Sequence, residues 1–276
     1  MLPRPLKQLG QHFLIDANIV RKIVALADLQ GQETLFEIGP GRGILTRALC
    51  GVANRVIAVE IDRQLYEHLR DHTGDCANLE LHQGDALEFP FSRLPDETVV
   101  VANLPYYLST ALLFRLLDHR DRFSRLVVML QTEVARRLIA GPGSKDYGVL
   151  SVLTQAAADA EMGFHVSAQC FRPRPEVGSS VVKLHVRRPA LLSPVQEGFF
   201  RPVVRASFAH RRKRLLNSLR DEGFSPEPVQ EALARLHRSP DCRAEQLSLD
   251  EFVRLAEALA EAGETGVIHD HPQRQK

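Results

Sequence analysis

A short polar and aromatic motif, Asn-Leu-Pro-Tyr at positions 103–106, follows directly after the apolar run 98–102. The side-chain oxygen of Asn103 and the backbone carbonyl of Leu104 could both accept hydrogen bonds from an exocyclic amine, and Pro105 restricts the backbone between them. Tyr106 offers a ring on which a planar base could stack. These residue types suit methylation of a base amine, a poor nucleophile that must be held in line with an electrophile. An ordinary loop is the alternative.

A glycine-rich turn is the second candidate site. The apolar run 35–38 predicts a buried strand, and Gly39, Gly41 and Gly43 follow it at a spacing of two before a helix. A dinucleotide fingerprint would require glycine or alanine at Ile44, so a nicotinamide cofactor is disfavoured. The pattern Glu-x-Gly-x-Gly-x-Gly instead resembles the S-adenosylmethionine loop of class I methyltransferases. A purely structural turn is the alternative.

Carboxylates end two further predicted strands. Glu60 lies at the end of the apolar run 55–61 and follows the first glycine of the turn by 21 positions, a spacing that suits hydrogen bonds to a ribose diol. Asp62 is the predicted cap of the next helix. Asp85 follows the run 79–83 and could accept a hydrogen bond from the amine of the cofactor's adenine, with a simple turn aspartate as the alternative.

Strands and helices alternate through the first two thirds of the chain, which predicts an α/β fold with a parallel sheet. A late antiparallel hairpin is expected at its edge. Asp16 is the expected N-cap of a helix that precedes the first strand. The arm 1–15 is either a loose terminus fixed by Phe13 and Leu14 or a lid beside the cofactor. The predicted strands are 35–38, 55–61, 79–83, 98–102, 125–130, 161–166 and 180–186.

Beyond Pro189 and Pro194 the pattern becomes wholly helical. We therefore expect a methyltransferase-type domain over 1–190, a small all-helical domain over 191–263 and a disordered tail over 264–276. The predicted C-terminal helices are 195–207, 211–220, 228–238 and 249–262.

The composition is that of an ordinary soluble protein, with 276 residues, 44% hydrophobic residues and a net charge of +1. No apolar run approaches the roughly 18 residues of a membrane span, and positions 1–9 lack the core of a secretory signal, so a cytoplasmic location is expected. The four cysteines form no C-x-x-C pair, and a metal site at His68 and His72 lacks a third ligand. No metal is expected, and a monomer is the default.

Basic residues are concentrated between positions 199 and 220, where seven arginines and lysines occur without any acid. Contact with RNA phosphates is the favoured interpretation, and a solvated helix face is the alternative. The seven residues are Arg201, Arg205, Arg211, Arg212, Lys213, Arg214 and Arg220.

Taken together, these motifs resemble the ribosomal RNA adenine N6-dimethyltransferase family over about residues 5 to 260. The similarity is carried by residues 11–14, 37–43, 103–106, 131–137, 171–179 and 210–219. It is strongest to the bacterial small-subunit members, which dimethylate two adjacent adenines in the 3′-terminal hairpin of 16S rRNA. The resemblance implies a class I methyltransferase fold with a mostly parallel seven-stranded sheet, S-adenosyl-L-methionine as cofactor, and 16S rRNA in the small ribosomal subunit as partner.

The resemblance also assigns roles to individual residues. Asn103 would make the catalytic hydrogen bond, and Tyr106 and Phe171 would sandwich the flipped base beside Leu104 and Pro105. The implied cofactor-binding residues are Gln11, His12, Leu14, Gly39, Gly41, Gly43, Glu60, Ile61, Asp85, Ala86 and Asn103. The implied RNA-binding residues are Arg172, Arg174, Arg205, Arg211, Arg212, Lys213 and Arg214. One departure is visible, because the family usually has asparagine at the position of His12.

Two other functions remain open at this point. Large-subunit adenine methyltransferases of the macrolide-resistance type share the glycine loop and a motif like that at 103–106. A binding protein without catalysis, acting as an assembly checkpoint on the small subunit, belongs to a different class.

Overall fold

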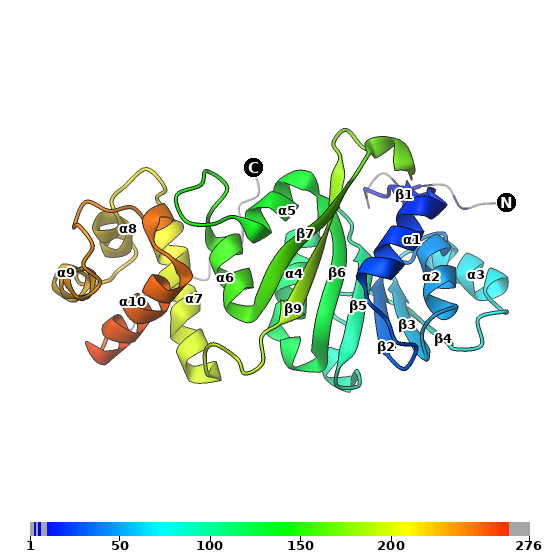
Figure 1. Cartoon of the computed structure of the whole chain (residues 1–276), viewed down its shortest axis with the longest axis horizontal. Coiled ribbons are helices and arrows are strands. Elements are labelled where there is room, and N and C mark those ends of the chain that lie inside the picture. Colours follow the sequence, from blue (N-terminus) through cyan, green and yellow to red (C-terminus); the bar gives the residue numbers. More distant parts are fainter. Residues whose placement is uncertain (1–2, 4, 7–9, 265–276) are drawn as a thin grey trace. The chain divides into compact units, whose positions relative to one another are not determined.

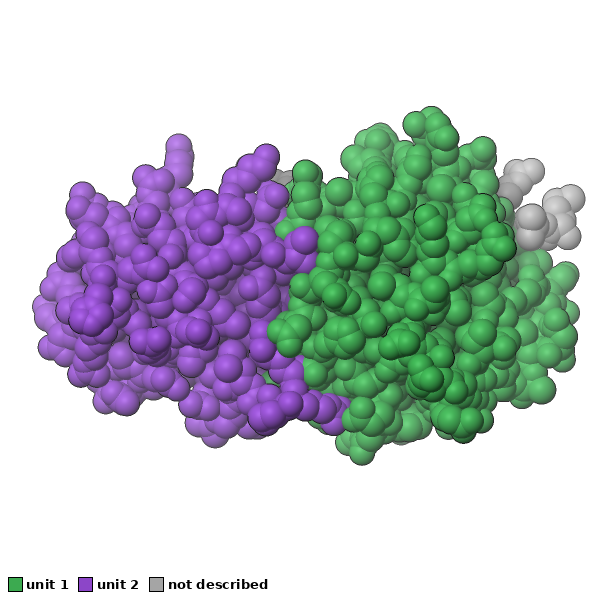
Figure 2. Space-filling view, in the orientation of Figure 1, with its two compact units in different colours: residues 1–136, 157–186 green, residues 137–156, 187–276 purple. Residues whose placement is uncertain are grey.

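A computed structural model describes the chain except residues 1–2, 4, 7–9 and 265–276, so nearly all of the tail predicted at 264–276 lies outside the described residues. The chain divides into two compact units (Figure 2). Unit 1 comprises Met1–Arg136 and Ala157–Val186, and unit 2 comprises Arg137–Ala156 and Arg187–Lys276.

Unit 1 is built around a seven-stranded sheet with the strand order β4-β3-β2-β5-β6-β9-β7 (Figure 1). All neighbouring pairs from β4 to β6 are parallel, whereas β9 runs antiparallel to both β6 and β7. The predicted α/β fold with a mostly parallel seven-stranded sheet and a late antiparallel hairpin is therefore confirmed. The strands are β2 (Thr34–Ile38), β3 (Arg55–Glu60), β4 (Leu79–Gln83), β5 (Thr98–Asn103), β6 (Phe123–Gln131), β7 (Ala158–Val166) and β9 (Ser179–Val186).

Both faces of the central strands are apolar. On one face, Leu35 of β2 belongs to a buried cluster that includes Ile23 of α1 and Leu49 of α2. On the other, Phe36 contacts the rings of Phe89 and Phe91 at centroid distances of 4.8 and 5.5 Å. This two-sided burial explains the continuous apolar runs in the sequence. The helices of this unit are α1 (Ala17–Leu26), α2 (Ile44–Cys50), α3 (Arg63–His72), α4 (Ser109–Asp118) and most of α5 (Thr132–Ile139).

The N-terminal arm is fixed where it reaches the sheet domain. β1 (Phe13–Leu14) pairs antiparallel with β8 (Phe171–Arg172) in a separate two-stranded sheet. Asp16 then caps α1 by accepting hydrogen bonds from the amides of Asn18 and Ile19, as predicted. Because β8 is distant in the sequence, local patterns could not reveal this pairing.

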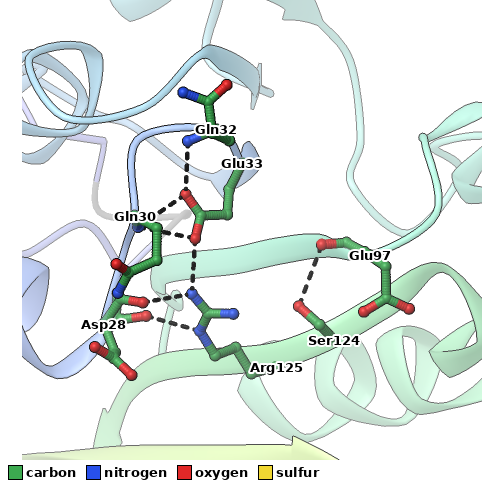
Figure 3. Close-up of polar contacts among 8 residues, drawn as sticks. Asp28, Gln30, Gln32, Glu33, Glu97, Ser124 and Arg125 are labelled. Carbon is green, nitrogen blue, oxygen red and sulfur yellow. Dashed lines mark hydrogen bonds and ion pairs between the residues drawn. The ribbon is translucent and has the colours of Figure 1, made fainter.

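A polar cluster fastens the loop between α1 and β2 to strand β6 (Figure 3). Arg125 of β6 donates to the carbonyls of Ala27 and Asp28 at 2.7 and 2.8 Å and forms an ion pair with Glu33 at 3.3 Å. Glu33 also accepts from the amides of Gln30 and Gln32. Burial opposes ionisation of Glu33, but these hydrogen bonds and the Arg125 charge together lower its pKa.

Unit 2 is helical apart from its connecting loops in the part of the chain that the structure describes. Its core contains Phe200 and Phe208 of α7 together with Phe252 of α10, and the rings of Phe208 and Phe252 lie 5.6 Å apart. Capping boxes at Ser193 and Ser248 start α7 and α10. The helices are α6 (Val149–Ala157), α7 (Pro194–Phe208), α8 (Leu215–Asp221), α9 (Pro226–Arg235) and α10 (Leu249–Glu261).

Two sequence-based boundaries differ from the structure. Residues 137–156, predicted within the first domain, cluster with the C-terminal helices: the amide of Gly143 donates to the carbonyl of Glu245 at 2.7 Å, and Tyr147 packs against Phe208 at 6.0 Å. The helix predicted at 211–220 begins only at Leu215. Residues 209–212 form a turn, and residue 213 lies in a bend.

No helix among the described residues has both the length and the apolar character needed to cross a bilayer. The described residues also contain no group of three histidine, cysteine or acidic side chains close enough to bind one metal ion.

Candidate active site

A cavity of unit 1 lies where β2, β3 and β5 end. The empty space measures about 820 Å³, including the part open to solvent, which is a common size for a cofactor site. Its walls combine the N-terminal arm, the glycine-rich turn and the segment after β5. The lining residues are Gly10, Gln11, His12, Phe13, Leu14, Glu37, Gly39, Pro40, Gly41, Arg42, Ile44, Leu45, Glu60, Ile61, Leu65, Asn103, Leu104, Pro105, Tyr106 and Tyr107.

The glycine-rich turn joins β2 to α2 in a conformation that side chains disfavour. Gly39 and Gly43 have φ angles of +64° and +78°, in the left-handed region that glycine adopts most readily. A Cβ at Gly39 would project into open space, whereas one at Gly43 would lie 2.6 Å from the Leu69 side chain. Gly39 therefore leaves room for a ligand at the cavity wall, and Gly43 allows the turn to pack against α3.

Glu60, at the end of β3, is almost fully buried with an exposed fraction of 3%. Its two carboxylate oxygens accept hydrogen bonds from the amides of Gly41 and Asp62 at 3.0 and 2.9 Å. Burial raises the pKa of Glu60 while these amides lower it, with a net rise. Each oxygen keeps a further lone pair that could accept from a hydroxyl group.

Asp62 connects the end of β3 to the arm. Its side chain caps α3, as predicted, and also accepts a hydrogen bond from the Gln11 side-chain amide at 3.0 Å. Gln11 is thereby held at the cavity wall beside Glu60.

Glu37 lies beneath the glycine-rich turn and is 1% exposed. Burial raises the pKa of Glu37 to about 8, and the nearby charge of Glu60 adds to the rise. Its Oε2 atom has no hydrogen-bond partner among the described residues. At neutral pH Glu37 is therefore mostly protonated in the free protein.

Asn103 ends β5 with its side chain at the cavity. Its Nδ2 atom lies 3.4 Å from the His12 carbonyl oxygen, to which it donates, whereas its buried Oδ1 atom has no partner within the described part of the chain. The following amide, that of Leu104, donates to the carbonyl of Met129 at 3.1 Å. The site thus presents a fixed, unused acceptor next to the glycine-rich turn.

Tyr106 forms the adjoining wall. Its hydroxyl lies 2.6 Å from Oγ of Ser179, and burial raises its pKa. The His12 ring faces it at a centroid distance of 5.4 Å and an interplanar angle of 30°.

Four predicted site residues do not line this cavity. Gly43 and Ala86 are buried, and Asp85 lines a separate hollow while its Oδ1 atom accepts from the amide of Leu87 at 2.8 Å. Phe171 is fully buried within the cluster that contains Leu14. The structure therefore does not bring the Phe171 ring opposite Tyr106, and its stacking role stays a prediction.

A match to a family model establishes the relationship of the whole chain. Residues 5–261 match the model described as ribosomal RNA adenine dimethylase. The chain belongs to this family. The resemblance inferred from the motifs is confirmed, and so is S-adenosylmethionine as the cofactor of the adenine dimethylase reaction.

Bacterial relatives are similar in sequence to this adenine dimethylase over most of their length. It is 43% identical over 266 residues to ribosomal RNA small subunit methyltransferase A of Moorella thermoacetica, with 92% of each chain covered. The same enzyme of Pelotomaculum thermopropionicum is 44% identical over 273 residues, covering 94% of this chain and 92% of the relative.

Solved structures resemble the fold of this family member as well. A dimethyladenosine transferase from Plasmodium falciparum has a TM-score of 0.79 and 26% identity, with 91% of this chain and 98% of that chain covered. The 23S rRNA methyltransferase ErmE has a TM-score of 0.71 and 26% identity, with coverages of 90% and 99%.

The cavity suits the cofactor of this dimethylase. The left-handed turn leaves open space at Gly39, and Glu60 keeps lone pairs for a ribose diol. The predicted residues that line the cavity together are Gln11, His12, Leu14, Gly39, Gly41, Glu60, Ile61 and Asn103 to Tyr106.

Nine of the lining residues were not predicted as site residues, among them Phe13, Glu37 and Arg42. Glu37 could have been suspected, because this acid stands two positions before the first glycine of the turn. Arg42 lies over the Phe13 ring, with its guanidinium carbon 4.4 Å from the ring centroid. No local pattern indicates that contact, because Phe13 is positioned by its pairing with the distant β8.

The predicted RNA-binding residues differ in their surroundings. All seven are exposed. Lys213 and Arg214 form ion pairs with Asp221 and Asp241 at 2.5 and 2.7 Å, so acids outside positions 199–220 partly balance these two charges. Arg211 donates to the carbonyls of Lys145 and Tyr147. Arg172 donates to carbonyls of its own segment, whereas Arg174, Arg205 and Arg212 have no polar partner among the described residues.

Proposed function

We propose that this protein is a 16S rRNA adenine N6,N6-dimethyltransferase that methylates two adjacent adenines in the 3′-terminal hairpin of small-subunit rRNA during ribosome biogenesis. The observation that carries the proposal is the buried, unpartnered Oδ1 atom of Asn103 in the same cavity as the glycine-rich turn. A buried acceptor without a partner is costly, and an N6 amine would satisfy it.

The chain's own residues would act by positioning. S-adenosylmethionine supplies an electrophilic methyl group when bound. Glu60 and the backbone around Gly39 would hold it, while Tyr106 supports the base from one side. Asn103 would accept a hydrogen bond from the amine, which favours a pyramidal nitrogen with a localised lone pair. No strong base is needed, because the amine becomes acidic once it is methylated and cationic.

Small-subunit rRNA is favoured over large-subunit rRNA by the comparisons. The curated relatives at 43% and 44% identity are named as small-subunit enzymes, whereas the 23S rRNA methyltransferase ErmE is 26% identical. The exposed arginines Arg174, Arg205 and Arg212 would contact rRNA phosphates. We further propose that the protein works as a monomer, without a metal ion, in the cytoplasm where its ribosomal substrate is assembled.

Methyl transfer to purified ribosomal particles tests the function. Incubation with immature small subunits and methyl-labelled S-adenosylmethionine should place label in N6,N6-dimethyladenine of 16S rRNA. Label confined to large-subunit RNA would contradict the assignment. Binding to small subunits without any label would favour the assembly checkpoint.

The role of Asn103 is tested by Asn103→Ala. We expect kcat to fall by about 10²–10³, the usual effect of removing one transition-state hydrogen bond, because the amine loses its acceptor. The dissociation constant of S-adenosylmethionine, measured by calorimetry, should change by less than about threefold. A large loss of cofactor affinity would instead identify Asn103 as a cofactor ligand.

A further inference from the structure

Glu37 is the buried acid of the cavity to which the proposed chemistry gives no role. It lines the cavity from β2, its exposed fraction is 1%, and its Oε2 atom has no hydrogen-bond partner among the described residues. A carboxylate in such a place loses its hydration without gaining a donor or an opposite charge, which strongly disfavours the ionised form. The geometry therefore indicates a neutral carboxyl group in the free protein.

Glu60, the second acid of the cavity, differs from Glu37 in its partners. Both carboxylate oxygens of Glu60 accept hydrogen bonds from backbone amides, at 3.0 Å from Gly41 and 2.9 Å from Asp62. The amide of Gly39, the first residue of the glycine-rich turn, donates to a carbonyl of β3 at 2.9 Å. Glu60 therefore has the hydrogen bonds that stabilise a carboxylate, whereas the Oε2 atom of Glu37 has none in the described part of the chain.

The positive charge of the cavity wall is engaged with the N-terminal arm. Arg42 is the single lysine or arginine among the described residues that line the cavity. It donates to the carbonyl of Pro3 at 3.0 Å and lies over the Phe13 ring. Cys50 of α2 is near Glu37, and burial raises the pKa of its thiol to about 12, so this thiol is neutral. The other titratable groups of the cavity wall are His12, Glu60, Tyr106 and Tyr107.

We propose that binding of S-adenosylmethionine ionises Glu37, which releases its proton to solvent and faces the positively charged cofactor as a carboxylate. The cofactor carries a sulfonium and an ammonium group against one carboxylate, so it is a net cation. A cation in a cavity of low dielectric constant favours the charged form of a nearby acid. Glu37 would respond to the cofactor whichever RNA is methylated, so the inference rests on S-adenosylmethionine and not on the RNA substrate of the proposed function.

The acid is well placed to change its charge near neutral pH. Burial raises the pKa of Glu37 to about 8 in the free protein, and the charge of Glu60 adds to the rise. A positive ligand acts in the opposite direction and lowers the pKa. Cofactor binding and proton release are therefore linked, and the affinity for the cofactor rises with pH until Glu37 is ionised in the free protein as well.

The charge of the product gives this linkage a use in the reaction. When the methyl group passes to the amine, the bonding electron pair stays on sulfur, and the sulfonium becomes a neutral thioether. S-adenosylhomocysteine is therefore less positive than the cofactor and stabilises the Glu37 carboxylate less. Dimethylation of one adenine consumes two cofactor molecules, so a site that prefers the charged cofactor favours exchange of product for fresh cofactor.

Calorimetry of cofactor binding in buffers with different ionisation enthalpies counts the protons released. At pH 7 wild type should release about 0.9 proton more per cofactor than Glu37→Gln, which is the protonated fraction of a group with a pKa of about 8. The variant keeps the shape of the side chain but cannot ionise. Protons exchanged by His12 or by the cofactor's own amino group are common to both proteins. Glu67→Gln is the matched control, because it removes an exposed carboxylate of α3 outside the cavity and should behave like wild type.

The pH dependence of affinity is a second measurement. Because the ionised form of Glu37 binds the cofactor, wild-type affinity should rise from pH 6 to pH 7 by about ninefold more than that of Glu37→Gln, given a pKa of about 8. Above pH 8 the two pH profiles should run parallel. Binding of S-adenosylhomocysteine to wild type at pH 7 should release about half as many protons as binding of S-adenosylmethionine, or fewer, because the sulfonium charge is missing.

Two results would overturn the proposal. Equal proton release by wild type and Glu37→Gln would show that Glu37 keeps its proton in the complex. Equal release on binding S-adenosylmethionine and S-adenosylhomocysteine would show that a contact common to both ligands, and not the charge lost in the reaction, ionises the acid. The comparison of the two ligands uses wild type alone, so it decides the matter even if Glu37→Gln does not fold. None of these measurements contains RNA, so they stand whether or not 16S rRNA proves to be the substrate.

Discussion

Glu37 illustrates how one buried side chain links stability to the site. Its side chain is buried beside the glycine-rich turn, and this burial raises the pKa of the carboxyl group to about 8 from an ordinary value of 4.5. The folded protein therefore retains a proton that the unfolded chain loses. Stability contributed by the protonated form is fully present below pH 4.5 and is lost as the pH rises toward 8.

We expect Glu37→Gln to remove this pH dependence. The free energy of unfolding of wild type should fall between pH 5 and 8 relative to the variant, because one pKa unit corresponds to about 1.4 kcal/mol. At pH 8 the variant should be more stable by a few kcal/mol, and at pH 5 the two should be nearly equal. Urea unfolding followed by circular dichroism at both pH values measures this difference. A difference that is the same at pH 5 and pH 8 would contradict the raised pKa.

At the scale of single elements, the glycine-rich turn has two roles: it leaves room for a ligand, and it packs against α3. The sequence alone does not show which glycine serves which role. Gly39 and Gly43 look alike in the pattern, yet a Cβ would meet open space at the first and Leu69 at the second. The predicted pattern identified the turn correctly. Which glycine faces the ligand depends on the packing of α3 against the turn, and that contact is not local in sequence.

Gly39→Ala and Gly43→Ala should therefore fail in different ways. Both introduce a side chain at positive φ, at a cost of about 1–2 kcal/mol. Gly43→Ala should lose about 1–3 kcal/mol more because it overpacks Leu69, which is 0% exposed. Gly39→Ala should fold better but bind S-adenosylmethionine at least about tenfold more weakly. Denaturant unfolding and calorimetry on both variants distinguish these outcomes, and equal effects on both measurements would contradict the division of roles.

Across the whole chain, hydrophobic periodicity predicted where the strands lie in the sequence better than it predicted which segments pack against one another. All seven strands of the large sheet occur near their expected positions, because apolar runs between polar segments are a local signal. The burial of Phe171 follows from the pairing of β8 with β1. The grouping of residues 137–156 with the C-terminal helices follows from contacts such as that of Tyr147 with Phe208. Such contacts join distant segments, and no local pattern records them.

The ion pairs of the basic residues likewise depend on contacts between segments that a local sequence pattern does not record. The run from Arg211 to Arg214 has no acid within it, yet Asp221 and Asp241 reach two of its members. Arg205 and Arg212 are exposed and have no polar partner in the described residues. Their charges are therefore available for phosphate contacts, whereas those of Lys213 and Arg214 are partly compensated.

This difference predicts how salt affects RNA binding. The logarithm of affinity falls with the logarithm of salt concentration by about 0.7–0.9 for each phosphate neutralised. Replacing Arg205 and Arg212 together by alanine should reduce that slope by about 1.5. Replacing Lys213 and Arg214 removes the same formal charge and should reduce it less, because each already has a carboxylate partner. Filter binding of small-subunit rRNA across a salt series measures both slopes. Equal reductions would show that net charge alone attracts the RNA, and an unchanged slope for Arg205 and Arg212 would remove both from the RNA interface.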